Sequence, residues 1–131
     1  MKFNNVFVVD DDKIFHFIIK KLLTSNNINI NPSYFLNGLE ALEGLKNKLD
    51  TGENQPDLIL LDINMPILDG WQFLEEFKKL KDKLKKEITI YIISSSHNQT
   101  DLDKAEVFSN EVQNYYLKPI SVDEIKSIFQ N

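Results

Sequence analysis

The 131-residue chain contains no cysteine, so disulfides, thiolate nucleophiles and cysteine-ligated zinc are excluded. Glycine and proline are scarce, at four residues each, which excludes low-complexity sequence and extensive disorder. No apolar run approaches the roughly 20 residues of a membrane span, and the first ten residues lack the basic start and long apolar stretch of a signal peptide. We therefore expect no membrane association and a cytoplasmic location.

An excess of positive charge is also missing. Twenty acidic residues against fifteen basic ones give a net charge of −5, whereas nonspecific nucleic-acid binding relies on neutralising phosphates with lysine and arginine. We therefore expect no nucleic-acid partner. The apolar fraction of 42% and the charged fraction of 27% are typical of an ordinary globular protein, and the length predicts a single domain over residues 1–131.

Five short apolar runs predict β-strands. They lie at residues 5–10, 30–35, 57–62, 88–94 and 112–117. The run "LILL" before Asp62 is continuous rather than alternating, as in a parallel strand that is buried on both faces. Pro32 interrupts the second run, which suits an edge strand because proline cannot donate a backbone hydrogen bond to a neighbouring strand.

The stretches between these runs have the apolar spacing of helices. In residues 13–25 one helical face is apolar, made by Ile14, Phe15, Ile18, Ile19, Leu22 and Leu23. A second helix is predicted to begin near Asn37, and a third to extend through the lysine-rich residues 78–87. Trp71 falls off the apolar stripe of the third helix, so we expect it to be a half-buried packing residue.

The last two predicted helices differ from each other in their sequence signals. Residues 98–109 carry few apolar side chains, so we expect a loosely held helix there. The final helix begins at Ser121, which forms a capping box with Glu124. Asp12 and Asp69 precede earlier helices and are predicted to be helix caps, since aspartate is a preferred capping residue.

Strands that alternate with helices predict parallel βαβ units with right-handed crossovers, and therefore an α/β sandwich of three layers. Ligands of such sheets bind outside the carboxyl ends of the strands. The residues that end the predicted strands are polar: Asp10, Asp11 and Asp12, then Asp62, then Ser94, Ser95 and Ser96, and finally Lys118. Acids, a hydroxyl and a lysine are therefore expected to converge at one edge of the sheet.

Carboxylates that lie this close repel one another unless they are protonated or bind a cation. An all-oxygen cluster with few protein ligands suits magnesium, with manganese as the other candidate. A cation and a lysine together can neutralise the charge on a phosphoryl group during in-line transfer. Asp62 could then act as the nucleophile and form an acyl phosphate.

The chain resembles the receiver domain of two-component response regulators, in particular the single-domain chemotaxis regulators. The resemblance rests on "VVDDD", "LLDINMPILDG", "IISSS" and "YYLKP", which occur in the family's order, and it covers essentially all 131 residues. It implies a doubly wound (βα)5 flavodoxin-like fold with strand order 2-1-3-4-5. It also implies a phosphorylation switch without a separate output domain.

The resemblance further implies a role for each matching residue. Asp62 would be the phosphoacceptor. Asp10 and Asp11 would be the acidic pair, with Asp11 the more direct ligand of Mg²⁺, and Asn64 would offer its backbone carbonyl to the metal. Lys118 would contact the phosphoryl group and precede a cis peptide bond, which an X-Pro sequence adopts at low cost.

Two further residues would form the switch. Ser94 falls where the family has the hydroxyl that binds a phosphoryl oxygen, although Ser95 is an alternative by register. Tyr115 falls on the family's switch aromatic. The output surface would comprise residues 98–109, 112–117 and the final helix. The implied partners are a sensor histidine kinase or histidine phosphotransfer protein, a downstream protein target, and a second copy in a phosphorylation-dependent homodimer.

Two other functions are alternatives to the phosphorylation switch. A phosphatase of the haloacid-dehalogenase kind also uses a strand-end aspartate with magnesium, but it needs a second aspartate two residues later, where this chain has Asn64. The other is a binding module that works independently of phosphorylation. We expect the chain to catalyse only its own phosphorylation and dephosphorylation, and so not to be an enzyme in the turnover sense.

Overall fold

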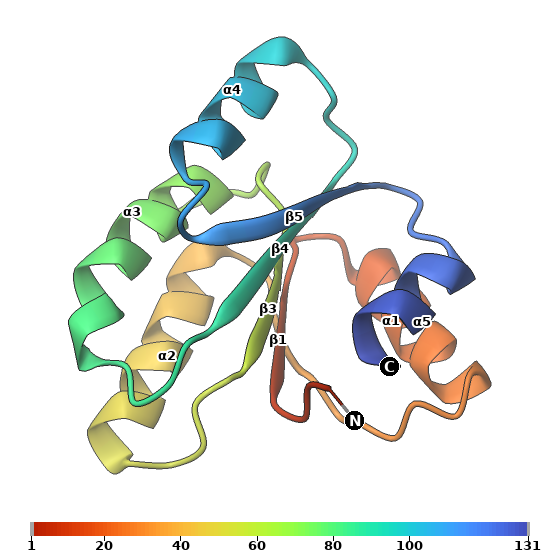
Figure 1. Cartoon of the computed structure of the whole chain (residues 1–131), viewed down its shortest axis with the longest axis horizontal. Coiled ribbons are helices and arrows are strands. Elements are labelled where there is room, and N and C mark those ends of the chain that lie inside the picture. Colours follow the sequence, from red (N-terminus) through yellow and green to blue (C-terminus); the bar gives the residue numbers. More distant parts are fainter. Residues whose placement is uncertain (1, 131) are drawn as a thin grey trace.

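The computed structural model describes residues 2–130, and within them the chain folds into one sheet covered by helices (Figure 1). The strands are β1 (Val6–Val9), β2 (Ser33–Phe35), β3 (Leu58–Leu61), β4 (Thr89–Ser94) and β5 (Val112–Leu117). The α-helices are α1 (Lys13–Ser25), α2 (Gly38–Thr51), α3 (Gly70–Leu80), α4 (Gln99–Val107) and α5 (Val122–Phe129). A short 3-10 helix, η1 (Lys81–Lys83), follows α3. None of the helices in this range is long and apolar enough to cross a bilayer.

All strand pairs are parallel, and the order in the sheet is β2-β1-β3-β4-β5. The predicted fold class and strand order are therefore confirmed. Helices α1 and α5 cover one face of the sheet, and α2, α3 and α4 lie on the other side (Figure 1). The change of direction in strand order falls between β1 and β3, which is where open α/β sheets form their ligand sites.

The central strands are buried on both faces. Every residue of β1 and of β3 is buried, which explains why their sequences are continuously apolar rather than alternating. One core, under α1 and α5, is built around Phe15, Ile19, Ile125 and Phe129. The other, under α2 and α3, is built around Leu45, Leu74, Phe73 and Phe77.

Strand β2 is an edge strand, as predicted, but it is shorter than the predicted 30–35. It contains only Ser33–Phe35 and begins directly after Pro32. Because proline has no backbone N–H, Pro32 cannot donate to β1, and the pairing begins at Ser33.

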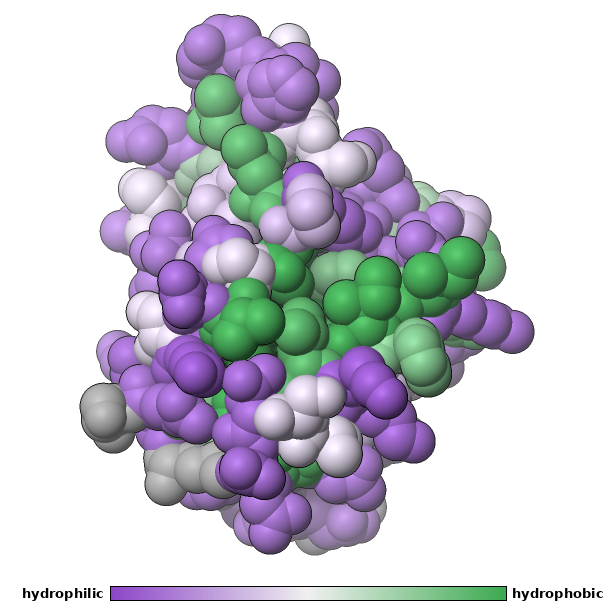
Figure 2. All heavy atoms as spheres, turned by 90° about the vertical axis from the view of Figure 1, so that its right-hand side faces the viewer, coloured by the Kyte–Doolittle hydropathy of each residue, from purple (hydrophilic) through white to green (hydrophobic). Residues whose placement is uncertain are grey.

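Helix α1 is only partly covered. Its buried residues are Phe15, Ile19 and Leu23, whereas Ile14 is 69% exposed and Ile18 is 42% exposed. The predicted apolar face is therefore wider than the stripe that the rest of the molecule covers. The uncovered side chains, together with Phe17 on the same helix, add to an apolar surface on the side of the molecule that carries α1 and α5 (Figure 2).

Helix α3 ends earlier than predicted. It stops at Leu80, and Leu84 has extended backbone angles after the single turn of η1. The prediction of a third helix extending through residues 78–87 was wrong. The cause lies elsewhere in the chain: the Gln55 side chain accepts a hydrogen bond from the Lys85 N–H and donates one to the Lys86 carbonyl. These contacts satisfy the backbone groups of Lys85 and Lys86 outside a helix.

Candidate functional site

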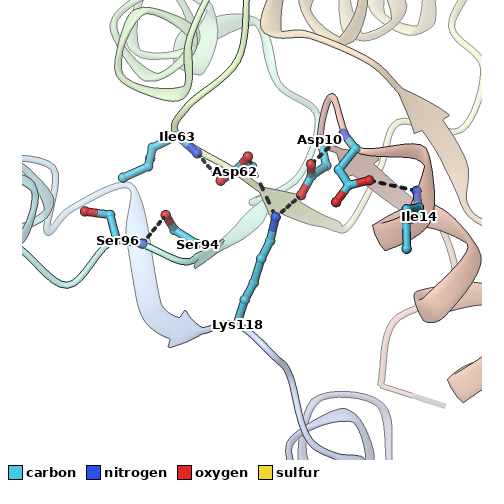
Figure 3. Close-up of polar contacts among 8 residues, drawn as sticks. Asp10, Ile14, Asp62, Ile63, Ser94, Ser96 and Lys118 are labelled. Carbon is cyan, nitrogen blue, oxygen red and sulfur yellow. Dashed lines mark hydrogen bonds and ion pairs between the residues drawn. The ribbon is translucent and has the colours of Figure 1, made fainter.

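Four strands deliver polar side chains to one edge of the sheet (Figure 3). Asp10 follows β1, Asp62 follows β3, Ser94 ends β4 and Lys118 follows β5. The parallel register pairs Val9 at the end of β1 with Leu61 at the end of β3. Asp10 and Asp62 directly follow these residues, so they lie side by side. Asp10, Asp62 and Ser94 are 1%, 7% and 0% exposed. The predicted convergence is therefore present.

The carboxylates form a compact cluster. Asp10, Asp11 and Asp62 each offer an oxygen, and these three atoms lie within 4.8 Å of one another. Asp11 is exposed, whereas the other two are buried. Burial, with the nearby charge of Asp10 as the next cause, raises the pKa of Asp62 to about 6. A cluster of oxygen donors that disfavours its own ionisation in this way fits a hard divalent cation.

Lys118 reaches into this cluster. Its Nζ donates to Asp10 Oδ2 at 2.7 Å and lies 3.9 Å from Asp62 Oδ2. It also lies 4.5 Å from the centre of the Phe15 ring, a distance at which an ammonium group is attracted to the face of the ring. The Lys118–Pro119 peptide bond is cis, as predicted. The ammonium group is thus held within reach of both buried aspartates.

Backbone groups orient the aspartates. The Ile63 N–H donates to Asp62 Oδ1 at 2.9 Å, which leaves Oδ2 on the side of Lys118. The Asp12 N–H donates to Asp10 Oδ1 at 2.9 Å. Asp12 itself caps α1 through the Ile14 N–H, as its sequence position indicated. The buried aspartates are therefore fixed by the main chain that follows each strand.

The loop after Asp62 returns tightly to the strand end. The Gly70 N–H donates to the Ile63 carbonyl at 3.0 Å. A side chain at Gly70 would place its Cβ 2.5 Å from the Asp62 carbonyl oxygen, so only glycine fits this approach. Asp69 caps α3 and forms a capping box with Gln72. Asn64 lies within this loop and is exposed.

Ser94 and Ser95 have different environments. Ser94 is fully buried as the last residue of β4, and its carbonyl accepts a hydrogen bond from the Lys118 N–H. Ser95 is exposed in the loop that follows. The Ser94 Oγ accepts a hydrogen bond from the Ser96 N–H at 3.1 Å (Figure 3). Of the two candidates, Ser94 is the hydroxyl that lies at the strand end.

Tyr115 lies on β5 beside the β4–α4 loop. Its hydroxyl donates to the Ser96 carbonyl at 2.7 Å, and burial raises its pKa. The neighbouring Tyr116 faces the other side of the sheet and packs edge-on against Tyr91, with ring centres 5.6 Å apart. Tyr115 is therefore the aromatic residue of this pair that contacts the loop after Ser94.

Sequence reasoning missed one part of the site. Trp71 is half-buried, as expected, and its ring stacks on Phe108, but its indole N–H also donates to Asp101 on α4. In the sequence, Asp101 is only an acidic residue in the first turn of a helix, where such residues are common. No local pattern relates two residues that are 30 positions apart, so only the tertiary structure could show this contact.

The known proteins that match this chain agree with the geometry. The sequence profile of the response regulator receiver domain matches residues 6–130. The chain belongs to this family. Among curated proteins, the probable transcriptional regulator ycf29 of Porphyra purpurea is 32% identical over 97% of this chain and 55% of its own length. The sensor histidine kinase CheAY of Helicobacter pylori is 32% identical over 94% of this chain and 14% of the kinase.

The chain thus spans about half of one relative and a small part of the other. Among solved structures, a two-component response regulator from Cytophaga hutchinsonii has a TM-score of 0.84 at 27% identity, covering 98% of this chain and 96% of that one. The phosphorylated cyanobacterial phytochrome response regulator RcpA has a TM-score of 0.77 at 26% identity, covering 97% and 89%. The Mn²⁺-bound response regulator Rcp1 has a TM-score of 0.74 at 25% identity, covering 97% of this chain and 89% of that one.

The receiver-domain prediction is therefore confirmed. The chain is a receiver domain of the two-component response regulators, which act as phosphorylation-dependent signalling switches and are regarded as non-catalytic signalling domains. Receiver domains bind divalent cations at an acidic pocket, and the cluster of Asp10, Asp11 and Asp62 could hold such an ion. Neither the family match nor these neighbours support the phosphatase or the phosphorylation-independent module.

Proposed function

We propose that residues 1–131 act as one receiver domain that accepts a phosphoryl group on Asp62. The donor is a phosphohistidine of a sensor histidine kinase or of a histidine phosphotransfer protein. The observation that supports this most directly is the placement of Asp62 Oδ2, which lies in a buried acidic cluster and 3.9 Å from the Lys118 ammonium group. Such a carboxylate can attack phosphorus while a neighbouring positive charge stabilises the transferred group.

Mg²⁺ is the proposed cofactor, and Mn²⁺ can replace it. The carboxylates of Asp10, Asp11 and Asp62 and the backbone carbonyl of Asn64 would hold it. When bound, the ion neutralises negative charge on the phosphoryl oxygens. Because burial raises the pKa of Asp62 to about 6, a cation in this cluster would also favour the ionised carboxylate that acts as the nucleophile.

The chain's own residues have separate tasks in the transfer. An Asp62 carboxylate oxygen forms the new bond to phosphorus as the bond from phosphorus to the donor imidazole nitrogen breaks, and the imidazole keeps the electron pair. Lys118 exchanges part of its contact with Asp10 for a phosphoryl oxygen. The Ser94 hydroxyl donates to another phosphoryl oxygen, because a hydroxyl that accepts from the Ser96 N–H can donate its own hydrogen at the same time.

Partner binding would respond through the surface formed by α4, β5 and α5. Ser94 and Tyr115 both contact Ser96, so a movement of the Ser94 hydroxyl toward a phosphoryl group would alter the position of Tyr115. A downstream protein, or a second copy in a phosphorylation-dependent homodimer, would recognise the altered surface. The cytoplasmic location and the absence of a nucleic-acid partner stay predictions from the sequence.

The donor protein is proposed to dock on the exposed apolar side chains of α1. Ile14, Phe17 and Ile18 are uncovered there. A pocket lined by Phe15, Ile18 and Lys118 connects this surface with the reactive edge. A partner that covers α1 would therefore place its phosphohistidine close to Lys118.

The test is chemical modification of the intact chain. Incubation with acetyl phosphate and Mg²⁺ should phosphorylate the wild-type protein, as measured by intact mass and by phosphate-affinity electrophoresis. Asp62→Asn should remove the modification, because the amide is not a nucleophile for this reaction. Asp69→Asn is the matched control, since Asp69 caps α3 and should leave phosphorylation intact. Failure of the wild-type chain to become modified would contradict the proposal.

A further inference from the structure

Helix α4 is held to the molecule in an unusual way. None of its nine residues, all within the described range, is buried, and Leu102 and Val107 are 39% and 72% exposed. Helices in globular proteins normally gain their stability from a buried apolar face. Hydrophobic burial along the helix is therefore slight, and polar and aromatic contacts contribute to the position of α4.

The indole ring of Trp71 supplies two of these contacts. Its Nε1–H donates to Asp101 Oδ1, in the first turn of α4, at 3.2 Å. Its ring stacks on Phe108, the C-cap of α4, with ring centres 6.0 Å apart and planes at 15°. Phe108 is 4% exposed. One side chain of α3 thus touches both ends of α4.

Ser96 supplies the third contact and connects it to the reactive site. All three of its polar groups are used: the N–H donates to Ser94 Oγ at 3.1 Å, the Oγ donates to Asp101 Oδ2 at 2.5 Å, and the carbonyl accepts from the Tyr115 hydroxyl at 2.7 Å. The two oxygens of Asp101 are therefore divided between Trp71 and Ser96.

We propose that Asp101 is a positioning residue that couples the Ser94 hydroxyl to the attachment of α4. Through Ser96 it holds the loop that presents Ser94 to Asp62, and through Trp71 it holds α4 against α3. This inference rests on the proposed function, since it assumes that a phosphoryl group forms at Asp62. It adds the physical link between that group and the output helix.

The coupling works in both directions. While Asp101 holds Ser96, the Ser96 N–H donates to the Ser94 Oγ. A hydroxyl that accepts in this way can still donate its hydrogen to a phosphoryl oxygen. When a phosphoryl group draws Ser94 toward Asp62, Ser96 moves with it. Asp101 must then move as well or lose one of its two partners, and either outcome changes the contact of α4 with Trp71.

Trp71 is the only tryptophan of the chain, so its fluorescence reports directly on this contact. The experiment compares the wild-type chain with Ser96→Ala, Asp101→Ala and Asp103→Ala, each titrated with Mg²⁺ alone and then with Mg²⁺ plus beryllofluoride. Asp103 is exposed on the same helix and accepts a hydrogen bond from the Gln99 side chain, so Asp103→Ala controls for the loss of an acid on α4.

Ser96→Ala is the decisive variant, because it keeps the pairing of Trp71 with Asp101 and removes only the Ser96 hydroxyl. The wild type and Asp103→Ala should change Trp71 emission when beryllofluoride binds. Ser96→Ala should still bind beryllofluoride but lose most of that change. In Ser96→Ala and Asp101→Ala, phosphorylation by acetyl phosphate should slow by up to about tenfold, as expected for one lost hydrogen bond to a positioning group.

Hydrogen–deuterium exchange of residues 99–107 provides the second measurement. These amides should exchange faster in unmodified Asp101→Ala than in the wild type or Asp103→Ala, whereas thermal unfolding should stay cooperative in all four proteins. The inference is overturned if Ser96→Ala behaves like Asp103→Ala in emission and phosphorylation rate, or if Asp101→Ala behaves like Asp103→Ala in exchange. If the wild type itself fails to bind beryllofluoride, the proposed function fails instead, so the two failures are distinguishable.

Discussion

The two ends of the signalling path are built from different interactions. At the reactive end, Asp10 and Asp62 extend from strands whose residues are all buried, and backbone N–H groups orient both carboxylates. At the output end, α4 has no buried residue in the described structure, and its Asp101 carboxylate accepts a hydrogen bond from Ser96 of the β4–α4 loop. The chemistry requires a fixed site, whereas signalling requires an element that about a few kcal/mol can move.

The comparison predicts a large difference in how the two regions contribute to stability. Phe73→Ala should lower the free energy of unfolding by about 3–5 kcal/mol, because Phe73 is fully buried in the core beneath α2 and α3. Val107→Ala on α4 should change it by less than about 0.5 kcal/mol, since that side chain is exposed. Urea denaturation of both variants measures the two values. Equal losses would show that α4 is as firmly anchored as the core.

The buried Asp62 carboxylate at the reactive end should lower the free energy of unfolding at neutral pH. Burial raises the pKa of Asp62 from 3.8 to about 6, so the folded state binds a proton more tightly than the unfolded state. The stabilisation from this proton is complete below pH 3.8 and is lost as the pH rises through about 6. Without divalent cations at pH 7.5, the free energy of unfolding of Asp62→Asn should therefore exceed that of the wild type by about 2–3 kcal/mol. Urea denaturation measures this difference.

Below pH 4 that difference should shrink toward zero, because the wild-type carboxyl group is then protonated in both states. Added Mg²⁺ should also reduce the difference at pH 7.5 by stabilising the wild type. A difference that is independent of pH between 4 and 7.5 would contradict the conclusion that burial disfavours the ionised Asp62 carboxylate.

The smallest expected effect concerns the apolar surface of α1. Phe17→Asp should slow phosphotransfer from a histidine phosphotransfer partner by about tenfold, an effect of about 1.4 kcal/mol, because Phe17 is 65% exposed on the proposed docking surface. The rate with acetyl phosphate, which needs no docking, should not change. Leu39→Asp on α2, another exposed apolar position, is the control and should leave both rates unchanged. Equal slowing by both substitutions would place docking elsewhere.

The sequence predicted most of the fold, and it did so where local rules are strong. The continuous apolar run of β3 identified a central strand, and the polar residue after each strand identified the reactive edge. The predicted end of α3 was wrong because the side chain of Gln55, 30 residues away, accepts a hydrogen bond from the backbone of Lys85. The exposure of Ile14 could not be read from periodicity either, because an apolar stripe does not say how much of it other elements cover.

The order of strands and helices and the polar groups at the strand ends follow from the amino-acid sequence, because the backbone conformation and apolar pattern of each segment depend on residues close in sequence. The distances between those groups and the contacts that hold the output helix depend on the packing of the whole chain. Asp101 contacts Ser96 and Trp71 from separate elements, and a contact of this kind exists only once packing has brought three segments together.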